Sequence, residues 1–165
     1  MNIIQVKSLD EIYEVKKLFK EYETYLNVEL DIDINFQNFE SELEQLPGKY
    51  APPSGTLLLA MDGQQAVSCG ALRRFGHIEK QTCEMKRLYV RPDNRKQGFG
   101  RKIATKLIRE ARVLGYSTMI LDTSARLKSA MNLYKSLGFV RTEPYYYNPV
   151  SDVVYWKLDL GVRNE

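Results

Sequence analysis

A run of six residues near the middle of the chain, Arg95-Lys96-Gln97-Gly98-Phe99-Gly100, has the composition of an anion-binding loop. It follows an apolar, strand-like segment at 82–90, and it opens a segment in which apolar residues recur at helical spacing from Gly98 to Leu114. The N-terminus of a helix carries unpaired N–H groups and a partial positive charge, and glycine lets a ligand approach the backbone closely. We therefore expect a phosphate-bearing ligand at this loop.

Three phosphate-binding patterns compete for this run. A dinucleotide fingerprint needs a small residue three positions after the second glycine, where Ile103 stands. A P-loop needs Gly-Lys followed by Ser or Thr, which the sequence lacks. The remaining pattern, Arg/Gln-x-x-Gly-x-Gly/Ala, is met by Arg95, Gly98 and Gly100.

The bulk composition predicts a single domain spanning 1–165. Of 165 residues, 44% are hydrophobic and 27% are charged, as in an ordinary globular protein. No apolar run approaches the about 20 residues that a membrane span needs, and the N-terminus does not resemble a signal peptide. Cys69 and Cys83 lie in apolar runs, so we expect buried free thiols. These features favour a cytoplasmic protein with no membrane partner.

The basic residues are concentrated between Arg91 and Arg112, although the net charge is only +3. Such a local patch suits a compact anion better than a nucleic acid, so we expect no nucleic-acid partner, and a nucleic-acid-binding domain is the rival interpretation. The one histidine, His77, follows Gly76 in an expected turn. Without a Cys/His cluster or a triad partner for it, we expect neither a metal site nor a hydrolytic triad.

The hydrophobic periodicity predicts seven strands and four helices. The strands are expected at 2–7, 56–61, 66–72, 82–90, 117–122, 139–141 and 153–158. The helices are expected from Ser8 or Asp10 to Leu26, across Phe36, Phe39, Leu43 and Leu46, from Gly98 to Leu114, and from Leu127 to Leu137. Five acidic residues in the second helix and the loop before it predict a solvated face, namely Asp31, Asp33, Glu40, Glu42 and Glu44.

This order predicts an α/β fold with a mixed, mostly antiparallel sheet and helices on both faces. The consecutive strands between 56 and 90 can pair as an antiparallel meander. The strand at 117–122 follows a helical crossover from the strand at 82–90, so these two should be parallel.

The loop motif, the predicted strand order and a second block, Ala130-Met131-Asn132-Leu133-Tyr134-Lys135-Ser136-Leu137-Gly138-Phe139, resemble the GCN5-related N-acetyltransferase (GNAT) family. The resemblance spans nearly the whole chain. It is strongest from Glu84 to Gly100 and in the second block, which the family shows as Ala-x-x-Leu-Tyr-x-x-x-Gly-Phe. It implies that the chain binds acetyl-CoA and transfers the acetyl group to an amine without an enzyme-bound intermediate.

The resemblance also implies which residues bind the donor. In the family the loop amides, here those of Gln97, Gly98, Phe99, Gly100 and Arg101, hold the pyrophosphate of coenzyme A, with Arg95 and Lys96 beside them. The fourth strand splays from its parallel neighbour, and the backbone of Leu88, Tyr89 and Val90 would pair with the pantetheine arm. One of these amides would also polarise the thioester carbonyl.

Two catalytic roles follow from the resemblance. Tyr134 stands where many members place the acid that protonates the departing thiolate, although its helical face would also suit a purely core aromatic. Glu84 stands eleven residues before Arg95, at the strand position of the catalytic glutamate in lysine acetyltransferases of histones. Deprotonating a lysine-like amine of pKa about 10.4 at neutral pH costs about 4 to 5 kcal/mol, so a nearby carboxylate base helps. The alternatives for Glu84 are a salt bridge to Lys86 or Arg87 and binding of a cationic substrate.

The sequence departs from the family in one place and is least informative about the acceptor. Leu127 stands where many members have an asparagine, so the hydrogen bond of that asparagine to the pantetheine arm is absent or comes from another residue, such as Asn132. Tyr145, Tyr146 and Tyr147 could form an aromatic wall of the acceptor cleft, a dimer interface, or packing for the first helices. The remaining candidates to face the cleft are Phe36, Gln37, Arg73 and Arg87.

The interpretation that results is an acetyl-CoA-dependent N-acetyltransferase acting on a small molecule or peptide. A non-catalytic acyl-CoA-binding module is the main alternative, and another acyl donor or a hydroxyl acceptor is compatible with the same motifs. A homodimer would also be compatible with the family.

Overall fold

A computed structural model describes residues 1–76 and 81–161, so His77 lies outside the described residues. One sheet of seven strands runs through this part of the chain in the order β1-β2-β3-β4-β5-β7-β6. The strands are β1 (Asn2–Gln5), β2 (Thr56–Asp62), β3 (Gln65–Arg74), β4 (Thr82–Val90), β5 (Thr118–Ser124), β6 (Val140–Thr142) and β7 (Val153–Asp159). Every neighbouring pair is antiparallel except β4 and β5, which are parallel as the sequence predicts.

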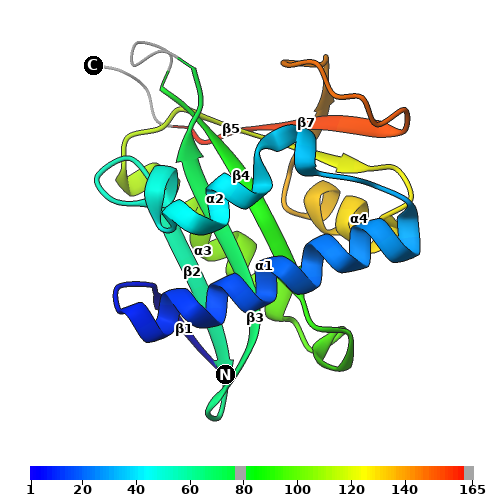
Figure 1. Ribbon diagram of the computed structural model, residues 1–165. Helices are drawn as coiled ribbons and strands as arrows, with labels where there is room; N and C mark the ends of the chain where they lie inside the picture. The colour runs from blue at the N-terminus through cyan, green and yellow to red at the C-terminus, as the bar shows by residue number, and fades with distance from the viewer. Residues whose placement is uncertain (77–80, 162–165) are drawn as a thin grey trace.

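Within residues 1–76 and 81–161, four α-helices cover the two faces of the sheet (Figure 1). They are α1 (Leu9–Leu30), α2 (Phe39–Gln45), α3 (Phe99–Val113) and α4 (Lys128–Ser136). In the view of Figure 1, α1 and α2 lie in front of the sheet and α3 lies behind it. Within the described residues, no helix is both long enough and apolar enough to cross a membrane.

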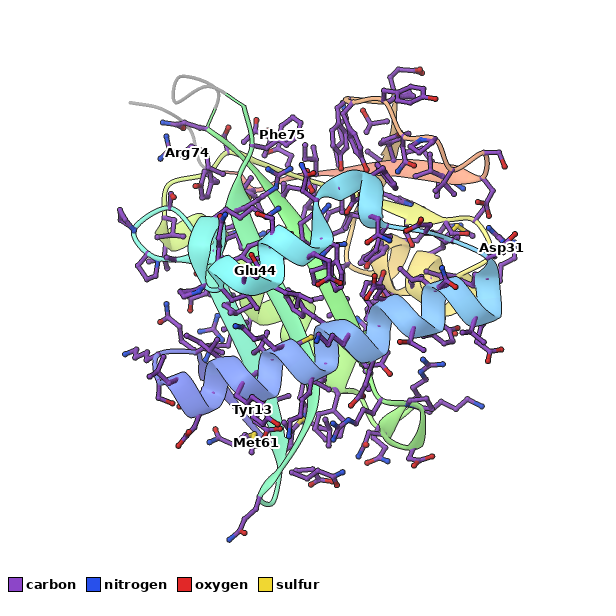
Figure 2. All side chains as sticks on the ribbon, viewed as in Figure 1. Tyr13, Asp31, Glu44, Met61, Arg74 and Phe75 are labelled. Carbon is purple, nitrogen blue, oxygen red and sulfur yellow. The ribbon has the colours of Figure 1, made fainter. Side chains whose placement is uncertain are left out.

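The start of α1 is fixed by Ser8 rather than by Asp10. The Ser8 hydroxyl accepts a hydrogen bond from the Glu11 N–H at 3.2 Å, and the Glu11 carboxylate accepts one from the Ser8 N–H at 3.0 Å. This reciprocal capping box satisfies two amides that would otherwise lack partners. The helix ends at Asp31, which adopts a left-handed conformation with φ of 52° and lies at the far end of α1 from Tyr13 (Figure 2).

The second helix is shorter than its apolar spacing predicts. Asn38 has a left-handed φ of 56°, which separates α2 from a 3-10 turn, η1 (Asn35–Gln37). Phe36 therefore belongs to η1 and is partly exposed, whereas Phe39 and Leu43 of α2 are buried as predicted.

The sheet separates two hydrophobic clusters. Successive residues of β2 alternate between them: Leu57 and Leu59 pack toward α1 and α2, whereas Leu58 and Ala60 pack toward α3. Side chains of a strand point alternately to opposite faces, so a strand covered on both faces is apolar throughout. The thiols of Cys69 and Cys83 are buried and free, as the sequence predicts.

Close packing of α3 on the sheet depends on Gly70 of β3. A Cβ at position 70 would lie 2.5 Å from Cγ2 of Ile103 and 3.1 Å from Cδ1 of Leu107. These distances leave no room for a side chain, so α3 lies directly against the backbone of β3.

Candidate active site

A cavity of about 710 Å³ opens where β4 and β5 diverge. The parallel pairing covers only 82–84 of β4 and 118–120 of β5. Beyond these pairs the two strands separate, and the cavity is lined by Met85–Val90 of β4 and by Asp122–Ser124 of β5. The splayed strands that the family resemblance implies are therefore present, and they leave one edge of β4 without a strand partner.

The loop before α3 forms one wall of this cavity. Lys96 and Gly98 have left-handed φ values of 63° and 86°, and Gly98 is the N-cap of α3. The first hydrogen bond of the helix runs from the Lys102 N–H to the Gly98 carbonyl at 3.0 Å, so the N–H groups of the first turn have no helical partner. No side chain among the described residues caps this end, and its first turn has no acidic residue. The arrangement is suited to bind an anion.

Basic side chains surround the loop. Arg95 lies over the ring of Tyr25, 4.7 Å from its centroid, and its Nε donates to the Val90 carbonyl at 3.2 Å. The Arg101 guanidinium donates to Ser136 Oγ of α4 at 2.7 Å. These contacts orient cations beside the unpaired amides. The Gln97 side chain instead donates to the Asp93 carbonyl at 3.2 Å, and Gln97 does not line the cavity.

Most residues predicted for the donor site meet at this cavity. They are Leu88, Tyr89, Val90, Arg95, Lys96, Gly98, Phe99, Gly100 and Arg101. Asn132 is exposed on α4 and is not one of the lining residues, so its contact with the pantetheine arm stays a prediction.

Tyr134 belongs both to the core and to the cavity. Its ring contacts the edge of Phe139 with centroids 5.7 Å apart, only 7% of the residue is exposed, and it lines the cavity. Its hydroxyl has no hydrogen-bond partner in the part of the chain that the structure describes. Burial raises the pKa of Tyr134, so the phenol keeps its proton at neutral pH.

Glu84 is buried behind the cavity rather than in its lining. Its carboxylate lies 3.2 Å from Arg73 Nη2 and 3.3 Å from Lys86 Nζ, and 1% of the residue is exposed. The ion pair with Lys86 is one of the alternatives that the sequence leaves open, and the role of Glu84 as a base stays a prediction. Its Oε1 has no hydrogen-bond partner within the described residues.

Arg87 pairs with a different carboxylate, and this overturns the prediction of a solvated face for Glu42. Arg87 Nε and Nη2 lie 2.8 and 3.3 Å from the two oxygens of Glu42, and Tyr50 and Lys49 also contact that carboxylate at 2.9 and 2.7 Å. Glu42 is only 8% exposed. Although burial opposes its charged form, Arg87 and Lys49 lower the pKa of Glu42 to about 2. The other four acidic residues, Asp31, Asp33, Glu40 and Glu44, are exposed as predicted.

The ion pair coincides with a bulge in β4. Arg87 has a left-handed φ of 57°, and the register between β3 and β4 shifts between Cys69 and Ala71. An extra residue in one strand redirects the side chains that follow it. Glu42 and Arg87 therefore join α2 to the strand at the point where β4 leaves β5.

The sequence interpretation missed Asp122, which lines the cavity from β5. Its Oδ2 accepts hydrogen bonds from the Tyr146 hydroxyl at 2.5 Å and from Asn148 Nδ2 at 3.0 Å. Asp122 was predicted only as the last residue of a strand. Open α/β sheets bind ligands at the carboxyl ends of their parallel strands. A polar side chain at such a position is therefore a candidate site residue, and this rule could have identified Asp122.

The tyrosine segment contributes differently from the predicted aromatic wall. Tyr145 and Tyr146 pack on each other and on Tyr155, and Tyr145 also contacts Phe75 (5.0 Å between centroids) near the top of Figure 2. Neither lines the cavity, and Tyr147 is exposed. Among the other predicted acceptor-side residues, Phe36, Gln37 and Arg87 line it and Arg73 does not.

Comparison with known proteins places this geometry in context. The model of the Acetyltransferase (GNAT) family matches residues 12–139. An uncharacterized N-acetyltransferase of Schizosaccharomyces pombe is 42% identical over 162 residues, which cover 98% of this chain and 96% of the relative. An acetyltransferase of Streptococcus agalactiae has the same fold, with a TM-score of 0.78 at 21% identity over 96% of this chain and 97% of that one. A putative acetyltransferase of Salmonella typhimurium, solved with its cofactor acetyl-CoA, has a TM-score of 0.72 at 20% identity over 100% and 96% of the two chains.

Proposed function

Because the chain belongs to the GNAT family of acetyltransferases, we propose that it transfers the acetyl group of acetyl-CoA directly to the amine of a small acceptor. The observation that carries the proposal is the position of the unpaired amides of α3 at a cavity that also contains Tyr134 and the free edge of β4. The anion-binding amides, the free edge of β4 and the Tyr134 side chain thus all border the same cavity.

The donor half of the cavity fits acetyl-CoA through backbone groups. The N–H groups from Gly98 to Arg101 would bind the pyrophosphate, and Arg95 and Lys96 add positive charge. A Cβ at Gly100 would lie 3.4 Å from Val90 Cγ2, an ordinary van der Waals distance, so the start of α3 lies beside the strand. The edge of β4 from Leu88 to Val90, which β5 does not cover, would hold the pantetheine arm and direct one N–H at the thioester carbonyl.

Acetyl-CoA supplies an activated acetyl group, so the protein must orient the amine, accept its proton and protonate the departing thiolate. Tyr134 holds its proton at neutral pH and lines the cavity, so we assign it the role of acid. Asp122 also lines the cavity, and we assign it the role of proton acceptor. Glu84 is a second proposal for that role, because within the described residues its Oε1 makes no hydrogen bond beside its ion pair with Lys86, and a water there would relay the proton.

Calorimetric titration with acetyl-CoA tests the donor site. We expect micromolar-range binding to the wild type and none to a variant with Gly98→Glu and Gly100→Glu, because two carboxylates would repel the pyrophosphate at the unpaired amides. Thr105→Glu is the matched control, since it adds a carboxylate to an exposed position of the same helix. Binding by the double variant at wild-type strength would contradict the proposal.

Release of free thiol from acetyl-CoA in the presence of amines tests catalysis. Tyr134→Phe should lower turnover and leave donor affinity within about threefold, because the hydroxyl acts on the thiolate and not on the pyrophosphate. Tight binding of acetyl-CoA without thiol release from any amine would favour a non-catalytic binding module.

A further inference from the structure

A continuous polar network borders the end of the cavity away from the phosphate loop. Lys86 Nζ donates to Gln37 Oε1 at 3.0 Å, Gln37 Nε2 donates to the Tyr146 hydroxyl at 3.2 Å, and this hydroxyl donates to Asp122 at 2.5 Å. Asn148 Nδ2 completes the network by donating to both Asp122 and Tyr146. The network connects β4, η1, the segment after β6, and β5.

One end of this network carries an excess of positive charge. Arg73 and Lys86 share the single carboxylate of Glu84, so two cations face one anion and the group has a charge of +1. Arg87 is paired with Glu42, whose carboxylate also contacts the more exposed Lys49 away from the cavity. Lys86 is the member of the group that lines the cavity, and 9% of it is exposed. A buried ammonium that is only partly compensated favours an anionic ligand.

The other end carries an excess of negative charge. Among the residues that the structure describes, Asp122 receives hydrogen bonds from the neutral side chains of Tyr146 and Asn148 alone, and both use its Oδ2. No described residue donates to Oδ1, and Asp122 lines the cavity. Burial lowers the pKa of the Lys86 ammonium, and the charge of Asp122 opposes that shift. Asp122 and Lys86 are joined through Gln37 and Tyr146, and both line the cavity, so the two opposite charges border the same space.

Two hydrogen bonds bridge neighbouring elements at the lining of the cavity. The bond from Gln37 to Tyr146 joins η1 to the segment after β6, and the Arg126 guanidinium donates to the Leu30 carbonyl at the end of α1. Gln37 and Arg126 both line the cavity. We expect these bridges to favour a compact ligand over an extended chain.

We propose that the acceptor is a free α-amino acid with an apolar side chain. Its carboxylate would face Lys86, its ammonium would face Asp122, and its side chain would contact Ile34, Phe36 and Val150 of the lining. The zwitterion complements both excess charges at once, which neither a simple amine nor a peptide N-terminus does. This inference rests on the proposed acetyl transfer and specifies its acceptor.

Three matched acceptors test the inference with the wild-type protein and acetyl-CoA: L-leucine, L-leucinamide and 3-methylbutylamine. They share a side chain and an amine, and only the first carries a carboxylate. We expect kcat/KM for leucine to exceed that of the other two by about 10- to 100-fold, as one charge-assisted contact would give. Equal or better acetylation of leucinamide, 3-methylbutylamine or a tripeptide with N-terminal leucine would overturn the inference while leaving acetyl transfer intact.

Substitution of Lys86 identifies the source of the preference. Lys86→Met should lower kcat/KM for leucine at least about tenfold more than for 3-methylbutylamine, and Lys86→Arg should retain much of the preference. An equal loss with both acceptors would overturn the assignment of Lys86. If Lys86→Met does not fold, the preference of the wild type for leucine over the other two acceptors still decides whether the inference holds. Acetyl-CoA binding without acetylation of any of these amines would overturn this inference, whereas the proposed function would fall only if no amine led to release of free thiol.

Discussion

The two ends of the cavity are formed by different kinds of group, backbone at one end and side chains at the other. The donor end consists of backbone N–H groups, two left-handed residues and an uncovered strand edge, all between Leu88 and Arg101. The acceptor end consists of side chains from β4, β5, η1 and the segment after β6, joined by hydrogen bonds. Backbone groups would recognise the coenzyme A portion that all acyl-CoA donors share. Side chains, by contrast, can be substituted without altering the fold. Under the proposed function, we therefore expect acceptor choice to be the part of the site that substitutions change most easily.

The largest loss should follow removal of the Asp122 carboxylate at the acceptor end. Asp122→Asn keeps the size of the side chain and removes the charge, so kcat/KM should fall by about 10²- to 10⁴-fold, while acetyl-CoA affinity stays within about threefold. Steady-state kinetics and calorimetry measure the two quantities. Asp62→Asn, at an exposed hairpin position, is the matched control. If Asp122→Asn retains wild-type kcat/KM, the proton acceptor lies elsewhere and Glu84→Gln becomes the decisive variant.

A substantial loss of stability should follow Glu42→Gln, because Arg87 would be left as a buried cation without its partner. We expect the free energy of unfolding at pH 7 to fall by about 3 kcal/mol, measured by urea denaturation. Glu40→Gln, on the exposed face of the same helix, should stay within about 0.5 kcal/mol of the wild type.

The pH dependence of this difference follows from the lowered pKa of Glu42. A carboxyl whose pKa is lower in the folded state stabilises the fold fully above its unfolded value and loses that effect as the pH falls through the folded value. The difference between wild type and Glu42→Gln should therefore shrink between about pH 4.5 and about pH 2. A difference that is constant across this range would show that the ion pair is not its source.

The smallest effect should come from Gly98→Ala at the donor end. A residue other than glycine at a φ of 86° is strained by about 1 to 2 kcal/mol, so the loop should relax away from this conformation when no ligand is bound. Acetyl-CoA affinity should then fall by about 5- to 30-fold. Gly63→Ala is the matched control, because Gly63 also has a positive φ, with open space around it, in the hairpin between β2 and β3. The comparison between the two ends would break down if Gly98→Ala altered acceptor preference instead of donor affinity.

The sequence predicts the donor end well because the signals are local. The glycines, the basic residues and the start of α3 lie within a few positions of one another, and hydrophobic spacing locates the flanking strand and helix. The seven strands and the single parallel pair follow from the same periodicity and from the helical crossover. Strand and helix ends differ from prediction by one or two residues in most elements, because local backbone conformation sets them.

The acceptor end could not be predicted in the same way. Gln37, Lys86, Asp122 and Tyr146 are distant in sequence, and only the folded chain brings them together. Glu42 looks like a surface residue in the sequence because its partner, Arg87, lies 45 positions away. The conformation of Arg87 at the bulge has no sequence signal, since its φ of 57° is unusual for a residue with a Cβ.

The close approach of Gly70 to Ile103 restricts which amino-acid substitutions these two positions can accept during evolution. A methyl group at position 70 would meet Ile103 Cγ2, one helical turn from Gly100, and would displace the helix whose first turn faces the donor. Only a smaller residue at 103, such as alanine, would make room for it. Substitutions at the two positions are therefore expected to occur as a pair, whatever acceptor the protein uses.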